Sequence, residues 1–403
     1  MSNEITKEPE IRFDGYKGDW EQRKLGDVTE RVRGNDGRMD LPTLTISAGN
    51  GWLDQRERFS GNIAGKEQKN YTLLHKGELS YNHGNSKLAK YGAVFELRTY
   101  EEALVPRVYH SFKVKKEAIA DFIEYMFATK RPDRELGKLV SSGARMDGLL
   151  NINFDEFMGI KISLPTVVEQ VSISELLRTL DDTITLHQRE LDLLEQTKQT
   201  YLQKMFPKTG EDKPEIRFAG FIDAWKQRKL GDVFTERSER SSEGELISVT
   251  INSGVVKASE LDRKDNSSND KSNYKKVEVG DIAYNSMRMW QGASGYSSYD
   301  GILSPAYTVI IPKEGIDSKF FAYDFKRYDM IQTFKRNSQG LTSDTWNLKF
   351  PTLKSVKVMV PCMEEQTKIS NFFERLDTTI ALHQRELDSL KEMKKTLLQK
   401  MFV

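Results

Sequence analysis

Apolar residues recur at alternating intervals of three and four in two segments of the chain, residues 165–206 and 361–402. The pattern continues for more than four heptads in each segment, with no proline or glycine after the first residue. A 3.5-residue period of this length is typical of a coiled-coil seam rather than of a globular helix. The predicted seam residues are Ile173, Leu177, Leu180, Ile184, His187, Leu191, Leu194, Ile369, Phe373, Leu376, Ile380, His383, Leu387 and Leu390.

Each predicted helix carries a single seam, and the residues between the helices are numerous enough for the chain to return. We therefore expect the two helices to pair with each other as an antiparallel coiled coil with an approximate two-fold axis. At about 1.5 Å per residue, a helix of about 38 residues is a rod of ~55 Å. Such a rod would hold two domains at a fixed separation.

Polar residues occupy two equivalent seam positions in each helix. His187 and His383 predict one polar layer that specifies the register, with a proton switch as a second interpretation. Lys198 and Lys394 are expected to extend their ammonium groups from the seam into solvent. Thr166 lies three residues before Glu169, a spacing that predicts a capping box at the start of the first helix.

The remaining segments predict an α+β fold. Short β-like runs occupy residues 38–47, 77–82, 92–97, 107–114, 159–164 and 306–311. Residues 117–128 and 319–334 have the periodicity of amphipathic helices. We therefore expect two mixed domains interleaved with the two long helices.

The chain contains a long internal repeat. Residues 10–28 and 215–233 are identical at 13 of 19 positions, and residues 165–206 and 361–402 at 24 of 42. The intervening segments share only a skeleton, such as Tyr81-Asn82 and Tyr284-Asn285, and their loops differ. The predicted organisation is a first domain at 1–164, a first helix at 165–208, a second domain at 209–360 and a second helix at 361–403.

Composition excludes several classes of protein. The 403 residues carry 61 Lys+Arg and 60 Asp+Glu, so a uniformly basic nucleic-acid coat is excluded. A single cysteine, Cys362, excludes a disulfide framework and favours a reducing, cytoplasmic location. No apolar run reaches the ~18 residues of a membrane span, and the polar start is not expected to be a signal peptide.

Signatures of catalysis are missing from the sequence. It contains no P-loop, no GxGxxG, no GxSxG and no HExxH motif, and the five histidines are scattered. We therefore predict neither catalytic residues nor a metal site.

Signals for nucleic-acid binding are local and recur in both halves. Four short segments combine Arg, Lys, Asn, Gln and Ser, the side chains that donate to base edges and phosphates. The candidate DNA-binding residues are Asn82, Asn85, Lys87, Lys90, Arg145, Asn285, Arg288, Trp290, Gln291, Lys335, Arg336, Asn337 and Gln339. Any one such loop alone is more often solvated surface, and the argument rests on their equivalent places in the two halves.

Together these features resemble the specificity subunit (HsdS) of type I restriction–modification systems. The resemblance rests on the doubled W-x-QRKLGDV motif and on the doubled helix with its LHQREL and LQKMF motifs, and it covers essentially the whole chain. It implies that each domain is a target recognition domain for one half of a split DNA target. It also implies that the coiled coil sets the spacing and docks two methyltransferase subunits, with two restriction/translocase subunits completing the complex.

The resemblance further implies that this chain is not an enzyme and binds no cofactor. S-adenosylmethionine, ATP and Mg²⁺ would bind to the partner subunits. Two other classes of function remain open from the residues alone. The chain could be a two-headed adaptor for protein or glycan, or a stand-alone DNA-binding regulator.

Overall fold

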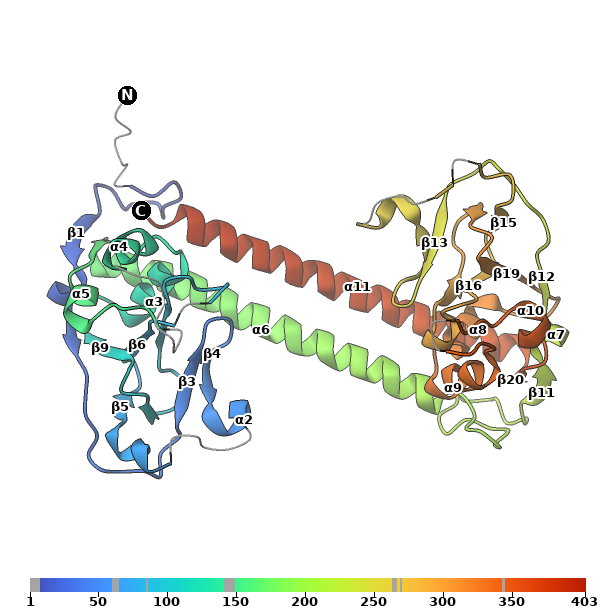
Figure 1. The fold of residues 1–403 in the computed structure, drawn as a ribbon, viewed down its shortest axis with the longest axis horizontal. Coiled ribbons are helices and arrows are strands. Elements are labelled where there is room, and N and C mark those ends of the chain that lie inside the picture. Colours follow the sequence, from blue (N-terminus) through green and yellow to red (C-terminus); the bar gives the residue numbers. More distant parts are fainter. Residues whose placement is uncertain are drawn as a thin grey trace. The chain divides into compact units, whose positions relative to one another are not determined.

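The computed structural model describes residues 8–403, with the exception of residues 60–64, 85, 141–148, 263–266, 269 and 343–344. The chain divides into two compact units, whose elements are labelled in Figure 1. Unit 1 comprises residues 1–187 and 386–403, and unit 2 comprises residues 188–385. The two long helices, α6 (Val167–Lys204) and α11 (Met363–Lys400), each contribute one part to each unit.

Unit 1 contains an α+β domain built on a four-stranded antiparallel sheet in the order β2-β9-β6-β7, accompanied by the strand pairs β1-β10, β3-β4 and β5-β8. The strands are β1 (Glu21–Lys24), β2 (Thr29–Arg31), β3 (Leu44–Ser47), β4 (Gly51–Asp54), β5 (Thr72–His75), β6 (Leu79–Asn82), β7 (Ala93–Glu96), β8 (Glu102–Val105), β9 (His110–Val114) and β10 (Lys161–Leu164). The short helices are α1 (Leu25–Val28), α2 (Gln55–Phe59), η1 (Gly65–Asn70), α3 (Ala120–Ala128), α4 (Asp133–Leu139) and α5 (Phe154–Met158).

Unit 2 repeats this arrangement with a sheet in the order β12-β19-β16-β17 and the strand pairs β11-β20, β13-β14 and β15-β18. The strands are β11 (Lys226–Lys229), β12 (Phe234–Glu236), β13 (Ile247–Thr250), β14 (Gly254–Lys257), β15 (Lys275–Val277), β16 (Ile282–Asn285), β17 (Ser294–Tyr296), β18 (Gly301–Leu303), β19 (Tyr307–Pro312) and β20 (Lys357–Val360). The short helices are α7 (Leu230–Val233), η2 (Ala258–Glu260), η3 (Met289–Gln291), α8 (Ser318–Asp324), α9 (Tyr328–Asn337) and α10 (Phe350–Leu353).

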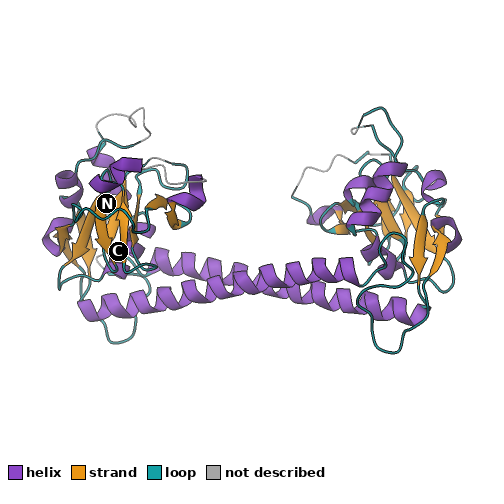
Figure 2. Ribbon diagram, turned by 90° about the horizontal axis from the view of Figure 1, so that it is seen from below, coloured by secondary structure: helices purple, strands orange, loops and turns teal. Residues whose placement is uncertain are grey.

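The two domains therefore have the same topology, and the strands of each form one group flanked by short helices (Figure 2). The register agrees as well. Leu79 on β6 is paired with Glu96 on β7, and the equivalent Ile282 on β16 is paired with Tyr296 on β17. The predicted α+β class with two homologous domains is confirmed.

One predicted helix is wrong in its extent. The segment expected to be a single helix over residues 319–334 forms two helices, α8 and α9, because the chain becomes extended at Arg327 (φ −67°, ψ 145°). The Arg327 guanidinium holds this bend by donating to the Asp324 carboxylate at 2.7 Å and to the Pro207 carbonyl at 3.2 Å.

Each domain core closes around a tryptophan from the repeated QRKLGDV block and a phenylalanine from the end of a long helix. In unit 1, Trp20 packs against Phe122 and Phe402, with ring centroids 5.6 and 6.1 Å away. In unit 2, the equivalent Trp225 packs against Phe320 at 5.7 Å and Phe206 at 6.0 Å. The repeated LQKMF motif is therefore a core element of the domain that receives it.

Within each unit, a segment of α6 lies antiparallel to a segment of α11. In unit 1, Asp181 contacts Lys394 and His187 lies beside Glu386. In unit 2, Glu190 lies beside His383 and Lys198 contacts Asp377. The residue numbers rise along α6 while they fall along α11, so the predicted antiparallel pairing of the helices is confirmed.

The two seam lysines differ from expectation. Their ammonium groups do not extend into solvent. Each bonds a carboxylate on the opposite helix at 2.5 Å, Lys394 to Asp181 and Lys198 to Asp377. Each also lies over a domain tyrosine ring, Tyr125 at 5.7 Å or Tyr323 at 5.9 Å. Each lysine therefore forms an ion pair with a half-buried carboxylate, and the heptad pattern does not predict this pairing.

The start of each long helix is tied to the segment that precedes the domain. Arg12 forms a bidentate ion pair with Glu169 (2.8 and 2.9 Å), and Arg217 forms the same pair with Glu365 (2.6 and 2.7 Å). The Thr166 hydroxyl accepts from the Glu169 amide at 3.3 Å, in agreement with the predicted cap. Among the described residues, no helix is both long and apolar enough to cross a membrane.

Candidate nucleic-acid interface

The loop at the end of strand β16 in unit 2 carries four predicted DNA-binding residues, Asn285, Arg288, Trp290 and Gln291. We define this β16 loop as residues 285–292. The Asn285 side chain accepts from the Met287 amide at 3.0 Å, and the Trp290 indole donates to the Met287 carbonyl at 3.1 Å. Met289 is fully buried and anchors the η3 turn, which ends at Gly292 with a φ of +84°. The loop is therefore a built structure with its own internal contacts.

Two further segments join the β16 loop. Trp290 packs edge-on against Trp346 at 5.2 Å, and the Lys335 ammonium lies 5.7 Å over the Trp346 ring. Gln339 exchanges backbone hydrogen bonds with Asn347 at 3.0 and 2.8 Å. The structure thus brings together candidates from the β16 loop, from the end of α9 and from the segment after it.

Several candidates of unit 2 have other surroundings. The side chains of Arg336 and Asn337 bond to Thr333 on their own helix at 3.0 and 2.9 Å. Gln291 lines a cavity beside the loop. Arg288 is half-buried, and its guanidinium makes no hydrogen bond or ion pair within the part of the chain that the structure describes.

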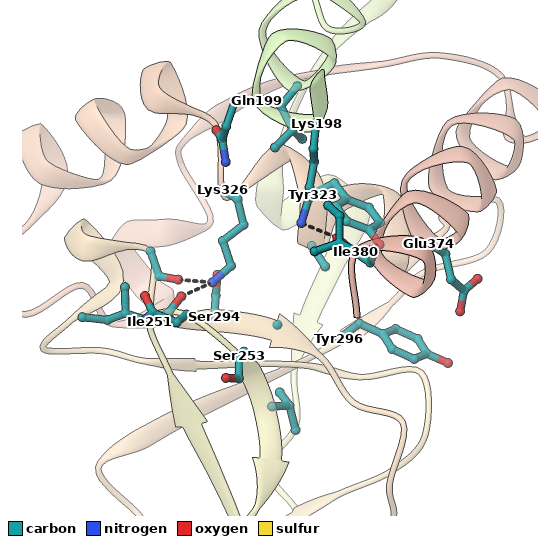
Figure 3. Close-up of a pocket in the computed structure, with 18 of the residues that line it drawn as sticks. Lys198, Gln199, Ile251, Ser253, Ser294, Tyr296, Tyr323, Lys326, Glu374 and Ile380 are labelled. Atoms are coloured by element: carbon teal, nitrogen blue, oxygen red, sulfur yellow. Dashed lines mark hydrogen bonds and ion pairs between the residues drawn. The ribbon is translucent and has the colours of Figure 1, made fainter. Parts of the chain in front are cut away.

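The cavity has a volume of about 940 Å³ and lies within unit 2, between the long helices and the β13–β14 hairpin (Figure 3). Lys326 reaches into its wall and donates to the carbonyls of Ile251 at 2.8 Å and Gly292 at 2.6 Å. Burial, followed by the charge of Lys198, lowers the pKa of Lys326 to about 8. Because Gly292 ends the β16 loop, Lys326 fastens that loop to the hairpin.

The equivalent loop of unit 1, the β6 loop (residues 82–91), is held differently. The Asn82 side chain donates to the Ile46 carbonyl at 3.3 Å and accepts from the Gly84 amide at 3.0 Å. Lys87 is exposed, and Lys90 lies 5.1 Å over the Tyr91 ring. The predicted candidates Asn85 and Arg145 lie outside the described residues. The unit 1 candidates that the structure describes, Asn82, Lys87 and Lys90, all lie in this loop.

An aromatic cluster that sequence reasoning missed supports the β6 loop. His83 and His110 lie 4.9 Å apart, and Tyr81 stacks on Phe157 at 4.2 Å. The His110 Nε2 is 2.9 Å from the Ile152 carbonyl, and burial lowers the pKa of His110. The His83 carbonyl accepts from the Leu150 amide at 2.8 Å. The repeated Tyr-Asn pair could have indicated this cluster, because it lies at the end of β6 and of β16, where the two loops begin.

The predicted seam residues vary in burial. Seven are buried, namely Ile173, Leu177, Leu180, Leu191, Ile369, Phe373 and Leu387. The other seven are half-buried, namely Ile184, His187, Leu194, Leu376, Ile380, His383 and Leu390. The outer faces of the long helices also carry exposed apolar side chains. Their exposed fractions are 55 % for Leu186, 63 % for Leu193, 53 % for Leu382 and 51 % for Met393.

Comparisons with known proteins agree with this geometry. The family model described as type I restriction modification DNA specificity domain matches residues 17–196 and 222–392. A curated relative, the type I restriction enzyme MjaIX specificity subunit of Methanocaldococcus jannaschii, is 33 % identical over 94 residues, which are 23 % of this chain and 21 % of the relative. The match thus spans about a fifth of the length of that relative.

Solved structures also resemble the chain. The crystal structure of the type I restriction–modification system S subunit from M. genitalium has a TM-score of 0.60 at 16 % identity, covering 98 % of this chain and 99 % of that one. The HsdS subunit from Thermoanaerobacter tengcongensis has a TM-score of 0.46 at 14 % identity, covering 96 % and 98 %. The first of these similarities establishes the fold.

Proposed function

Because the chain belongs to the family of type I restriction–modification DNA specificity domains, we propose that its two domains recognise the two halves of a split DNA target. The observation that supports this most directly is the contrast within the repeat. The two domains have the same strand order, whereas the β6 and β16 loops differ in sequence and in contacts. A common frame with divergent loops suits two readers of different sequences.

The residues gathered at these loops have the chemistry of DNA readers. In unit 2, the Arg288 guanidinium can bond a guanine in bidentate fashion, and Lys335 can contact a phosphate. In unit 1, Lys87 and Lys90 are exposed in the same loop as Asn82, and we retain Asn85 and Arg145 as candidates. The net charge of only +1 suits a subunit whose partners enclose the duplex and supply further basic surface.

The long helices are proposed to set the spacing of the half-sites and to dock two methyltransferase subunits. The exposed Leu186, Leu193, Leu382 and Met393 side chains are apolar surface that a partner would cover. Two restriction/translocase subunits complete the proposed complex. This chain is its non-catalytic member, and S-adenosylmethionine, ATP and Mg²⁺ bind to the partners.

The proposal is tested by gel-shift titration of a DNA duplex that carries the motif methylated in a host with the system. The titration is run with and without co-expressed methyltransferase subunits. A specificity subunit binds tightly only in the complex. Tight binding by the chain alone would favour a stand-alone regulator. No binding in either state would favour an adaptor of another class, and either result would contradict the proposed function.

A further inference from the structure

Each domain docks on its own long helix through a set of contacts that is nearly the same in both units. The Tyr125 hydroxyl donates to Asp181 at 2.9 Å, and the Tyr323 hydroxyl donates to Asp377 at 2.9 Å. The Gln170 side chain accepts from the Ile119 amide at 3.0 Å, and that of Gln366 from the Asp317 amide at 3.0 Å. These contacts would allow either domain to dock on either helix.

One docking contact has opposite polarity in the two units. In unit 1 the domain supplies the anion and the helix the cation, because Asp121 on α3 pairs with Arg178 on α6. In unit 2 the domain supplies the cation, because Lys319 on α8 pairs with Glu374 on α11 at 2.6 Å. The positions are equivalent, since Asp121 and Lys319 each lie four residues before the docking tyrosine. Arg178 and Glu374 each lie three residues before the docking aspartate.

The surroundings of the pair change with its polarity. In unit 1, Arg178 lies 4.0 Å from Glu96, and Asp121 also binds Arg98. In unit 2 the position equivalent to Glu96 is Tyr296, whose ring lies 5.2 Å from the Lys319 ammonium. Both Tyr296 and Glu374 line the cavity shown in Figure 3. In unit 1 the helix arginine therefore faces two carboxylates of its domain, whereas in unit 2 the domain lysine faces one carboxylate of its helix and a neutral aromatic ring.

We propose that this inverted ion pair is a matching device that makes each domain compatible with its own helix and incompatible with the other. A first domain moved to the second position would place Asp121 against Glu374, and a second domain moved to the first position would place Lys319 against Arg178. Like charges across an interface select against the wrong partner. Exchange of domains between the two positions therefore requires a change of the helix residue as well. This inference concerns the docking of the domains and stands independently of DNA recognition.

A double-mutant cycle in the full chain measures the pair. Glu374→Arg places a cation against Lys319, and Lys319→Asp places an anion against Glu374. We expect each variant to raise the amide hydrogen-exchange rates of α8 several-fold, and the double variant to return them to within about twofold of the natural chain. Glu215→Lys is the matched control, since it disrupts the similarly exposed Lys204–Glu215 pair of 2.7 Å in the same unit. The control should leave α8 unchanged. Additive effects of the two single substitutions would overturn the proposal.

Replacing the second domain by a copy of the first gives a second test, in which the direction of the change in hydrogen exchange is decisive. Residues 33–160 are copied in place of residues 238–356, so that both positions hold the first domain. In this chain Glu374→Arg should slow hydrogen exchange in the transplanted α3, whereas the same substitution speeds exchange in α8 of the natural chain. An effect of the same sign in both chains would overturn the proposal. Because no DNA is involved, this outcome is separate from any failure of the proposed DNA recognition, and the double-mutant cycle decides the matter if the transplant does not fold.

Discussion

Unit 1 and unit 2 share most of the contacts by which the domain docks on its helix, whereas the loops after β6 and β16 are held by different contacts. The hydroxyls of Tyr125 and Tyr323 bond their helix aspartates at the same distance of 2.9 Å. The β16 loop, by contrast, closes a turn around the fully buried Met289, while the β6 loop is tied by Asn82 to the Ile46 carbonyl. The docking tyrosines bond an aspartate that the repeated helix carries in both units. Each loop is held by contacts within its own domain, so the two loops can differ in sequence while the strand order stays the same.

The largest effect is expected from altering the helices that both units share. Inserting one heptad between Leu191 and Lys198, and one between Leu387 and Lys394, keeps both seams in phase. The helices lengthen by ~10.5 Å at 1.5 Å per residue, which corresponds to ~3 base pairs at about 3.4 Å each. Surviving complexes should methylate the same half-sites across a longer gap, with reduced affinity because the grooves are rotated. Methylation at the original spacing would contradict the account, and a four-residue insertion in one helix should abolish assembly.

Removing either helix-end phenylalanine should destabilise only the unit whose core it enters. Phe402→Ala should destabilise unit 1 and Phe206→Ala unit 2, each by about 3–5 kcal/mol, because both rings are buried against a core tryptophan. Hydrogen exchange resolved by segment measures the effect in each unit. Equal loosening of both units by either substitution would show that the cores are not independent.

Changing a reader should affect one half-site only. Arg288→Ala should weaken binding of the assembled complex by about 1–3 kcal/mol if the guanidinium contacts a guanine. The loss should be confined to the half-site read by unit 2. Arg336→Ala is a useful comparison, since the Arg336 guanidinium already bonds Thr333 and its loss should cost less. Unchanged affinity and an unchanged methylated motif would remove Arg288 from the interface.

The two units should also respond differently to pH, with the smallest of these effects. Burial raises the pKa of Glu96 in unit 1 from 4.5 to about 8, so the native state keeps a proton that the unfolded chain releases. Stability from this group is therefore present below about pH 4.5 and lost as the pH rises toward 8. Burial lowers the pKa of Lys326 in unit 2 from 10.5 to about 8, so unit 2 gains stability as the pH rises from 8 toward 10.5.

Variants assign these pH effects. Glu96→Gln should weaken the pH dependence of the stability of unit 1 between about pH 5 and 8. Lys326→Met should weaken that of unit 2 above about pH 8. Denaturant unfolding followed by segment-resolved hydrogen exchange provides the measurement. Curves that stay parallel to those of the natural chain would exclude these two groups as the source.

Sequence patterns predicted the frame because the frame is repetitive. The seam spacing revealed both long helices, and the doubled LQKMF block marked an element whose phenylalanine enters each core. Contacts between segments distant in sequence carried no such signal. Trp346 joins Trp290 and Lys335 only through the fold, and the break at Arg327 depends on Asp324 and Pro207. The capture of Lys198 by Asp377 likewise depends on which helix faces it.

The central claim is that each domain reads its own half of the target, and one exchange tests it most directly. Residues 33–160 are replaced by the matching segment of a relative with a different target, and the methylated motif of a host carrying the assembled system is sequenced. The account predicts a new first half-site, with the second half-site and the gap between them unchanged. A motif altered in both half-sites, or unaltered in both, would contradict it.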